Sequence, residues 1–252
     1  MTGGAPATGL PPVWVVSLAR ATDRRAFVST VYAELGIEPV VIDAVDGRAL
    51  TDEQIDRYSE VRATFAYGRG LTRAEVAIAL SHLALCRRMV DENVDDVVVL
   101  EDDVRPTPAL LDVLSERWSF PADLDVLTLH SLFDWATPTP VDGRVIAGGF
   151  RVCRYARTPM GTQAYLLRRR AARRLLDVGF PVRLPADELL FRRHPAGLLV
   201  YGIAPSPVDH DEFPSELHRA PAPVSEHPWW ETTMLHAVRF AGRVRNRLRS
   251  GR

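Results

Sequence analysis

The chain has 252 residues, of which 46% are hydrophobic and 25% charged, a composition typical of a globular protein with room for one large domain or two small ones. The formal net charge of -1 creates no overall field that would draw the protein to nucleic acid. All 31 basic residues are arginines, which excludes a P-loop lysine and a Schiff-base lysine.

The first twelve residues are rich in Gly and Pro, and we expect them to be disordered. They have neither the basic start nor the apolar centre of a signal peptide. No apolar run approaches the roughly 20 residues that a membrane span requires. The two cysteines, Cys86 and Cys153, stand far apart and in no metal-ligand spacing, which indicates a reducing compartment. We therefore expect a cytoplasmic protein.

The next segment predicts a strand, a helix and a second strand. Residues 13–18, "VWVVSL", form an apolar run typical of a buried strand. Thr22 can cap a helix over residues 23–35 that Gly36 ends. Residues 39–44, "PVVIDA", predict the second strand. Strand, helix and strand in about thirty residues make a βαβ unit, the building block of a parallel sheet.

A longer helix follows at residues 73–93. Thr72 and Glu75 form a capping box at its start, and its apolar residues cover nearly the whole circumference, so the helix should be buried. Strands are predicted at residues 97–100 and 125–130. The alternation of strands and helices in this part of the chain indicates an α/β fold.

From about residue 134 the pattern changes. Turn signals and short alternating runs predict a hairpin around Asp142 and Gly143. A strand at 164–167 and a helix at 168–179, ended by Gly179, come next, and the arginines of that helix are interpreted as a solvated face. Residues 204–228 are rich in Pro and predict an irregular loop. We infer one domain over residues 13–230, followed by a basic amphipathic helix at 231–252.

Three carboxylates follow the predicted strand at 97–100, namely Glu101, Asp102 and Asp103. Ligands of open α/β sheets bind beyond the carboxyl ends of the strands. Clustered carboxylates there are costly unless a cation neutralises them, and Mg²⁺ or Mn²⁺ typically shares its ligands with substrate phosphates. The stretch therefore fits a metal–diphosphate site. The alternative is that these acids cap a turn and face water.

Several familiar site motifs are missing from the sequence. It contains neither G-x-G-x-x-G nor G-x-x-x-x-G-K-[ST], so neither a dinucleotide fingerprint nor a P-loop is predicted. It also lacks H-E-x-x-H and G-x-S-x-G, which leaves zinc-protease and nucleophile-elbow chemistry without support.

Five segments, in this order, resemble the motifs of glycosyltransferase family 25, the group of lipooligosaccharide and procollagen galactosyltransferases. They are "VVSLARATDRR", "IDAVDGRAL", "LTRAEVAIALSH", "VVVLEDDV" and "GTQAYLL" with its downstream "LPADELL". The resemblance implies a single-domain GT-A type fold, with a Rossmann-like, mainly parallel sheet flanked by helices. It also implies a UDP-sugar donor and a divalent cation, Mn²⁺ or Mg²⁺. Ser17 stands where the family usually has Asn, and residues 74–78 depart from Gly-Glu-x-Gly-Cys.

The resemblance suggests roles for the polar residues at the strand ends. Asp102 and Asp103 are the predicted metal ligands. His210, which comes much later in the chain, is the candidate imidazole ligand. Glu101 is expected to contact or orient the ribose. The other predicted donor-binding residues are Ser17, Arg20, Arg24 and Asp46, where arginine suits phosphate because its planar fork donates two hydrogen bonds. Each has a structural alternative: a solvated turn or cap for the arginines, an Asx-turn for Asp46 and a solvated loop for His210.

Asp187 is the candidate general base, with Glu188 as the neighbouring alternative. The bacterial relatives implied by the resemblance transfer with inversion, which requires a carboxylate to accept the acceptor hydroxyl's proton. Asp187 could instead be a helix N-cap. Ser81 and His82 lie on a helix with little polar surface. They are either a hydrogen-bonded core pair that positions the carboxylate loop or direct substrate contacts.

We therefore expect a metal-dependent hexosyltransferase of glycan biosynthesis that moves galactose or glucose from a UDP-sugar to a saccharide or glycoconjugate. The alternative is a catalytically silent relative that binds nucleotide sugars or glycans, which the departures at Ser17 and around Glu75 keep open. The C-terminal basic helix could contact anionic lipid on the inner face of the membrane, or be a plain surface helix. We expect no nucleic-acid partner.

Overall fold

The computed structural model describes residues 9–130, 143–154, 159–192, 195–210 and 213. The predicted C-terminal helix at 231–252, most of the Pro-rich loop and the first eight residues lie outside this range. None of the helices in the described part of the chain is both long and apolar enough to cross a lipid bilayer.

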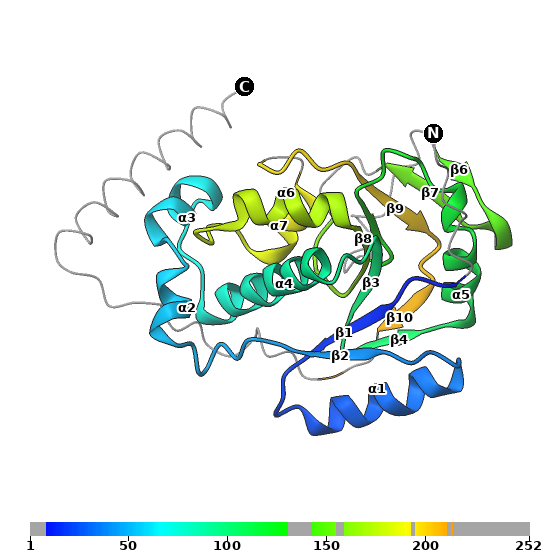
Figure 1. Cartoon of the computed structure of the whole chain (residues 1–252), viewed down its shortest axis with the longest axis horizontal. Helices are drawn as coiled ribbons and strands as arrows, with labels where there is room; N and C mark the ends of the chain where they lie inside the picture. Colours follow the sequence, from blue (N-terminus) through cyan, green and yellow to red (C-terminus); the bar gives the residue numbers. More distant parts are fainter. Residues whose placement is uncertain (1–8, 131–142, 155–158, 193–194, 211–212, 214–252) are drawn as a thin grey trace.

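The core of the molecule is an eight-stranded sheet with the strand order β2-β1-β3-β8-β5-β9-β7-β6 (Figure 1). Strands β8 and β7 run opposite to the others. This confirms the predicted α/β class with a mainly parallel sheet. The strands are β1 (Val13–Ser17), β2 (Val40–Asp43), β3 (Asp96–Glu101), β5 (Val126–Thr128), β6 (Arg144–Val145), β7 (Arg151–Arg154), β8 (Ala164–Arg168) and β9 (Val200–Ala204).

The predicted βαβ unit is confirmed. β1 pairs in parallel with β2 on one side and β3 on the other, and helix α1 (Thr22–Glu34) makes the crossover. Thr22 was wrongly predicted as the cap: it is already helical, and Ala21 is the N-cap, without a side-chain hydrogen bond. β2 is an edge strand whose residues are mostly exposed, which explains why its apolar run is short.

Helix α4 (Arg73–Asp91) follows two shorter helices that the sequence reading missed, α2 (Asp52–Asp56) and α3 (Glu60–Tyr67). The capping box of Thr72 and Glu75 is confirmed, with both reciprocal hydrogen bonds present. Ten of the residues of α4 are buried, as its apolar circumference predicts. This long helix lies across one face of the sheet (Figure 1).

The chain leaves β3 through a tight turn and enters the short strand β4 (Val104–Pro106), which departs from the main sheet. β4 pairs with β10 (Val208–His210) in a separate two-stranded sheet, with His210 opposite Val104. Helix α5 (Pro108–Ser115) and a short 3-10 helix (Arg117–Ser119) then lead to β5. The β4–β10 pair therefore holds a late segment of the chain beside the end of β3.

The turn predicted at Asp142 and Gly143 cannot be compared with the structure, because Asp142 and the residues just before it lie outside the described residues. The described part of this region contains a hairpin whose turn comes later in the chain. β6 and β7 are the paired strands, and the chain turns between them at a 3-10 segment (Ala147–Gly149). Gly148 and Gly149 supply the turn because both have positive φ, at 69° and 78°, a conformation that favours glycine. β8 then runs antiparallel between β3 and β5.

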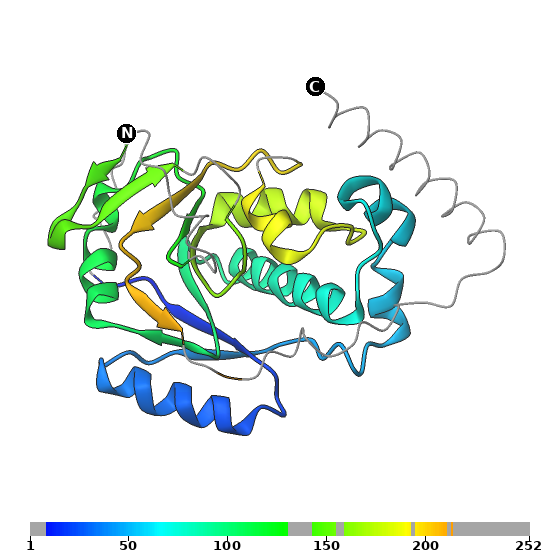
Figure 2. The same cartoon turned by 180° about the vertical axis from the view of Figure 1, so that it is seen from behind.

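Helices cover both faces of the sheet (Figures 1 and 2). One face of β1, β3 and β8 packs against α4, α6 (Arg169–Gly179) and α7 (Ala186–Phe191). The other face packs against α1 and α5. Because side chains alternate between the two faces of a strand, β3 contributes Val97 and Val99 to the first core and Val98 and Leu100 to the second. Cys86 and Cys153 are both free and buried, and Cys86 is part of the first core.

Candidate functional site

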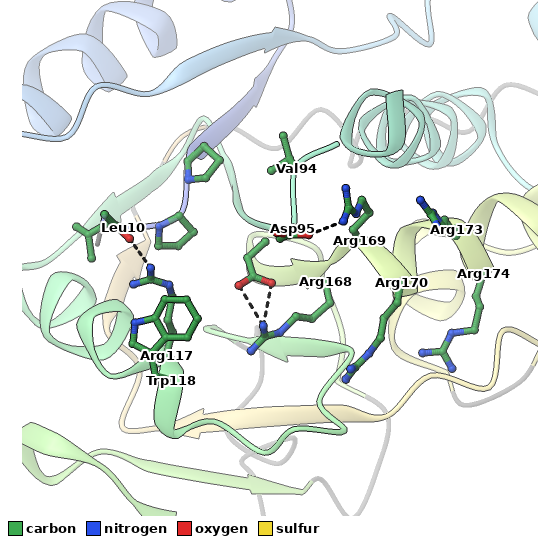
Figure 3. Close-up of a pocket in the computed structure, with 14 residues that line it drawn as sticks. Leu10, Val94, Asp95, Arg117, Trp118, Arg168, Arg169, Arg170, Arg173 and Arg174 are labelled. Atoms are coloured by element: carbon green, nitrogen blue, oxygen red, sulfur yellow. Dashed lines mark hydrogen bonds and ion pairs between the residues drawn. The ribbon is translucent and has the colours of Figure 1, made fainter. Parts of the chain in front are cut away.

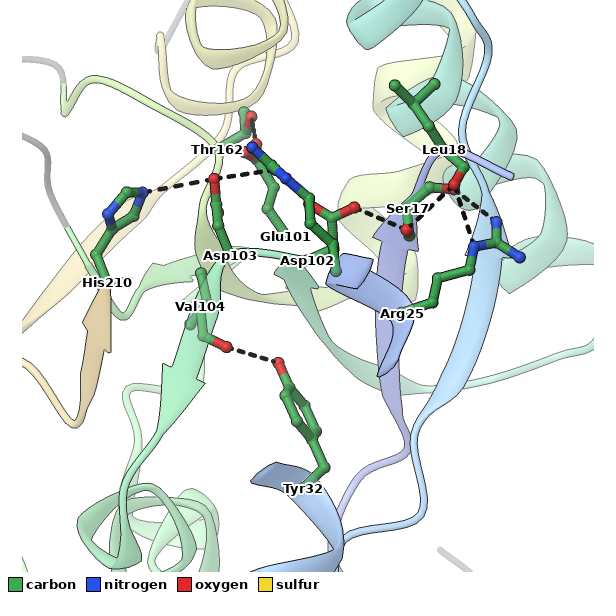
Figure 4. A network of polar contacts seen from close by, with 11 residues as sticks. Ser17, Leu18, Arg25, Tyr32, Glu101, Asp102, Asp103, Val104, Thr162 and His210 are labelled. Atoms are coloured by element: carbon green, nitrogen blue, oxygen red, sulfur yellow. Dashed lines mark hydrogen bonds and ion pairs between the residues drawn. The ribbon is translucent and has the colours of Figure 1, made fainter. Parts of the chain in front are cut away.

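The three carboxylates lie together at the carboxyl edge of the sheet (Figure 4). Glu101 is the last residue of β3, and Asp102 and Asp103 form the turn before β4. β1 also ends at this edge, so Ser17 lies beside the turn. Asp102 and Asp103 are buried, with 6% and 9% of their surface exposed. Parallel strands that end side by side thus produce the crowding of acids that the sequence indicated.

Asp102 already has a partner for each of its oxygens. Ser17 Oγ donates to Oδ2 over 2.7 Å, and Arg24 Nη1 donates to Oδ1 over 2.6 Å. Burial lowers the pKa of Arg24, but the hydrogen bond to Asp102 and the charges of the acids raise it overall, so this arginine is firmly charged. Asp102 therefore links β1, α1 and the turn after β3.

Asp103 is less completely satisfied. Its Oδ2 lies 3.3 Å from Arg24 Nη1 and 3.6 Å from His210 Nε2. Its Oδ1 is buried and has no hydrogen-bond partner among the described residues. Burial raises the pKa of Asp103, and Asp102 adds to the rise, while His210 and Arg24 oppose it. A buried carboxylate oxygen without a partner is costly, and a bound cation would remove that cost.

Glu101 completes the cluster. Thr162 Oγ1 donates to Glu101 Oε1, which joins the start of β8 to the end of β3. Burial, together with the negative charge of Asp103, raises the pKa of Glu101 to about 7. Two of the three acids thus have raised pKa values, chiefly because burial disfavours their charged forms.

The fit of a divalent cation rests mainly on Asp103. Within the described residues, no three His, Cys, Asp or Glu side chains are arranged as a ready metal site. Mg²⁺ is commonly bound by one or two carboxylates together with substrate phosphates, and Asp103 Oδ1 offers such a ligand. Asp102 would have to release Arg24 or Ser17 before it could coordinate a metal. The residues fit a cation that a bound phosphate helps to hold.

Arg20 and Asp46, both predicted to bind the donor, bind each other across the loops that follow β1 and β2. Arg20 Nε donates to Asp46 Oδ2 over 2.7 Å, and Asp46 Oδ1 accepts from Arg48 N over 2.9 Å, as an Asx-turn does. Burial opposes ionisation of Asp46, but Arg20 and the Arg48 amide lower its pKa overall. The ion pair is exposed, at 38% for the Arg20 side chain, and so lies open to a ligand.

Asp187 lies in the first turn of α7 and not at its N-cap, which is Pro185. It accepts hydrogen bonds from Gly161 N over 3.2 Å and from Glu188 N over 2.8 Å. Gly161 has a φ of 82°, so the tight bend before Thr162 requires glycine. This bend brings Asp187 to the segment that holds Glu101. Glu188 pairs with Arg192 over 3.0 Å, and burial raises its pKa.

Ser81 and His82 are structural residues and do not pair with each other. Ser81 Oγ accepts from Val45 N over 2.9 Å, which ties α4 to the loop after β2. His82 Nδ1 lies 2.7 Å from Tyr165 Oη of β8, and burial lowers the pKa of this histidine to about 4. Each residue thus ties α4 to another part of the fold, Ser81 to the loop after β2 and His82 to β8, so the expected hydrogen-bonded pair of the two is not formed.

Three contacts of the site were not predicted as such. Thr162 stood in a quoted motif without a role, yet it binds Glu101. Arg25 donates to Asp43 and to the Ser17 carbonyl, and its only signal was its place next to Arg24. His130 stacks on His210 with ring centroids 6.1 Å apart. No local pattern could have found this last contact, because 79 positions separate the two histidines.

Comparison with known proteins identifies the family. Residues 10–190 match the profile of glycosyltransferase family 25, described as LPS biosynthesis protein. The chain belongs to glycosyltransferase family 25. The match includes every predicted site residue except His210.

Family 25 relatives in animals share part of the chain. The probable inactive glycosyltransferase 25 family member 3 of Bos taurus is 33% identical over 200 residues, which cover 74% of this chain and 33% of that protein. Procollagen galactosyltransferase 2 of Mus musculus is 31% identical over 102 residues, which cover 38% of this chain and 16% of that protein. The chain thus spans about a third, or less, of the length of these relatives. Among solved structures, A197 from STIV has a TM-score of 0.47 at 11% identity, covering 87% of this chain and 96% of that chain.

Proposed function

We propose that this family 25 protein is a metal-dependent hexosyltransferase with a GT-A type fold that uses a UDP-sugar donor. The observation that carries the proposal is the carboxylate cluster, in which Asp103 Oδ1 is buried and has no hydrogen-bond partner among the described residues. Burial also raises the pKa of Glu101 beside it. Family membership supplies the class of reaction. A saccharide or glycoconjugate is the proposed acceptor.

Asp103 is the proposed principal metal ligand, with His210 beside it and Asp102 as the second carboxylate. When bound, a divalent cation supplies positive charge that offsets the donor diphosphate. Arg24 is already held among the acids, so its positive charge lies beside the place proposed for the donor diphosphate. Arg20, Asp46 and Ser17 border the same edge, where we place the nucleoside.

Asp187 is the proposed general base. The acceptor hydroxyl oxygen forms a bond to C1 of the donor sugar while the bond from C1 to the diphosphate oxygen breaks. The electron pair leaves with the nucleoside diphosphate, and the hydroxyl proton passes to Asp187. Attack from the face opposite the leaving group inverts the configuration at C1. The amides of Gly161 and Glu188 hold this carboxylate in one orientation.

A second candidate function has specific support. The bovine relative is named as probably inactive, and both oxygens of Asp102 are occupied by protein groups. A silent relative would bind nucleotide sugar at the same edge and not transfer it. The two candidates would both bind the nucleotide sugar, but only the first would transfer the sugar.

The test measures hydrolysis and transfer for UDP-glucose, UDP-galactose and their N-acetyl derivatives, with Mn²⁺, with Mg²⁺ and with EDTA. We expect turnover only with a divalent cation. D103N should lower it by about 100-fold or more, because charge stabilisation at the leaving diphosphate is lost. D187N should lower transfer by about 100-fold or more while leaving UDP binding intact.

D112N is the matched control, since Asp112 is an exposed residue of α5 and the substitution removes the same charge. Its turnover should equal that of the wild type. Calorimetry that detects UDP binding, with no turnover of any donor, would support the silent relative. A folded D103N protein with full activity would remove the metal role from Asp103.

A further inference from the structure

A second, strongly basic pocket lies at the opposite edge of the sheet (Figure 3). It has a volume of about 910 Å³ and lies where β1 and β3 begin and where β8 ends. The length of β3, six residues, separates this edge from the carboxylates by about 17 Å. The pocket is therefore no part of the proposed donor site. Its charged lining consists of Asp95, Asp96, Arg117, Arg168–Arg170, Arg173 and Arg174.

The arginines of this pocket outnumber the acids that pair with them. Arg168 pairs with Asp96 and Arg169 with Asp95, while Arg170 and Arg174 share the buried Asp125. In the described part of the chain six arginines line the pocket, and four of these, Arg168, Arg169, Arg170 and Arg174, share three aspartates. The excess charge attracts anions, and the N-terminus of α6 at the same place adds to the positive potential.

Two donors of the pocket have no partner in the described part of the chain. Arg173 is exposed, and no hydrogen bond or ion pair of its side chain is present there. Arg168 Nε is buried and has no hydrogen-bond acceptor. Arginine suits carboxylates and phosphates because its planar fork matches their oxygens. The arginine-rich start of α6, predicted to be a solvated face, is indeed partly exposed, and it also lines this cavity.

An aromatic side chain faces these arginines across the pocket. Trp118 is 56% exposed, a large fraction for an indole, and the Arg117 guanidinium carbon lies 4.2 Å from its ring centroid. Figure 3 shows Arg117 and Trp118 on one side and Arg168–Arg174 on the other. An exposed indole offers a flat apolar surface on which the C–H face of a sugar ring can pack.

We propose that this pocket is a second saccharide site, which binds sugar units that bear carboxylate or phosphate groups. The indole of Trp118 packs against a sugar ring, and Arg173 and Arg168 bind the acidic group. The site is independent of the proposed transfer reaction. A single-stranded nucleic acid would use similar groups, but such sites align several aromatic side chains along a groove. The described lining of this pocket contains one aromatic side chain, and the net charge of the protein is -1.

Calorimetry with trigalacturonate tests the proposal, with the neutral trisaccharide maltotriose as the comparison ligand. The full-length wild type should bind trigalacturonate, increasingly weakly as salt is raised, and should bind maltotriose at least about tenfold more weakly. R173E and W118A should each weaken trigalacturonate binding by about tenfold. R62E makes the same charge change at an exposed arginine of α3 and should leave binding unchanged.

Four other outcomes would contradict the proposal. The proposal is wrong if the wild type does not bind trigalacturonate up to millimolar concentration. It is also wrong if neither R173E nor W118A weakens the binding. Inorganic phosphate that binds as tightly as trigalacturonate, with no effect of W118A, shows a simple anion site. Tighter binding of oligo-dT than of trigalacturonate shows a nucleic-acid site. D103N should bind trigalacturonate like the wild type, and R173E should retain basal donor hydrolysis, so failure here is distinct from failure of the proposed function.

Discussion

At the scale of single residues, the buried polar side chains divide into those that are satisfied and those that await a partner. His82 belongs to the first group, since it is 2% exposed and hydrogen-bonded to Tyr165. Asp103 belongs to the second, with a buried oxygen that has no hydrogen-bond partner in the described part of the chain. This difference is the basis for giving His82 a structural role and Asp103 a chemical one.

His82 makes the stability of the fold depend on pH. Its pKa is about 4 in the folded protein and about 6.5 when unfolded, because burial disfavours the charged ring. Above pH 6.5 the His82 ring is mostly neutral in both the folded and the unfolded protein, so it does not lower the free energy of unfolding. As pH falls below 6.5 the unfolded state takes up a proton that the folded state does not, which costs about 2 kcal/mol at pH 5.

Chemical denaturation of wild type and H82Q at pH 7 and pH 5 measures this effect. The loss of unfolding free energy between the two pH values should be smaller in H82Q by about 2 kcal/mol. The other histidines are present in both the wild type and H82Q, so their contributions to the change in unfolding free energy cancel in the comparison. Equal losses in the two proteins would show that His82 does not resist protonation.

At the scale of elements, the parts of the fold that the sequence predicted were those with local signals. The capping box of Thr72 and Glu75 and the apolar run of β3 were both recognised. The direction of β8 was not, because an apolar run such as Ala164–Arg168 fits either orientation and its place between β3 and β5 is decided by packing. α2 was missed although Thr51 and Gln54 form a capping box of their own.

The two capping boxes should differ in their effect on stability. T72A removes the side chain that accepts from Glu75 N at 3.2 Å and should destabilise the protein by about 1 kcal/mol, because α4 is part of the core. T51A removes the same group from α2, which has five residues and none of them buried. Its loss should fray α2 locally and change global unfolding by less than about 0.5 kcal/mol.

Urea denaturation of the two variants measures the difference. T51A serves as the matched control, since both threonines accept from the backbone three residues ahead. Equal destabilisation by the two substitutions would mean that α2 unfolds together with the core. That result would contradict the absence of buried residues in α2.

At the scale of the whole molecule, the sheet separates two sites of opposite charge. The acids gather where β1 and β3 end, and the arginines gather where these strands begin. The acidic edge was predictable, because the carboxylates are adjacent in the sequence and follow an apolar strand. The place of His210 in the acidic edge was not predictable, because His210 reaches Asp103 only through the β4–β10 pairing. The basic pocket was not predictable either, because only the fold brings Trp118 opposite the arginines of α6.

The proposed cation and donor should stabilise the entire fold, since a ligand that binds only the folded state adds its binding free energy to stability. With Mn²⁺ and UDP each present at about 100 times its dissociation constant, the joint gain should be at least about 2.7 kcal/mol. For a chain of this size that raises Tm by about 5–10 °C. UDP with EDTA should give a smaller shift, because the diphosphate then lacks its counter-charge beside Glu101 and Asp103.

Thermal unfolding of wild type, D103N, D112N and R173E distinguishes the two edges. D103N should lose the part of the shift that depends on Mn²⁺, whereas D112N and R173E should keep it, since neither residue is part of the carboxylate cluster. A Mn²⁺-dependent shift that D103N retains in full would place the cation elsewhere. A shift that R173E abolishes would mean that the nucleotide binds at the arginine-rich edge, and the assignment of the two edges would then have to be exchanged.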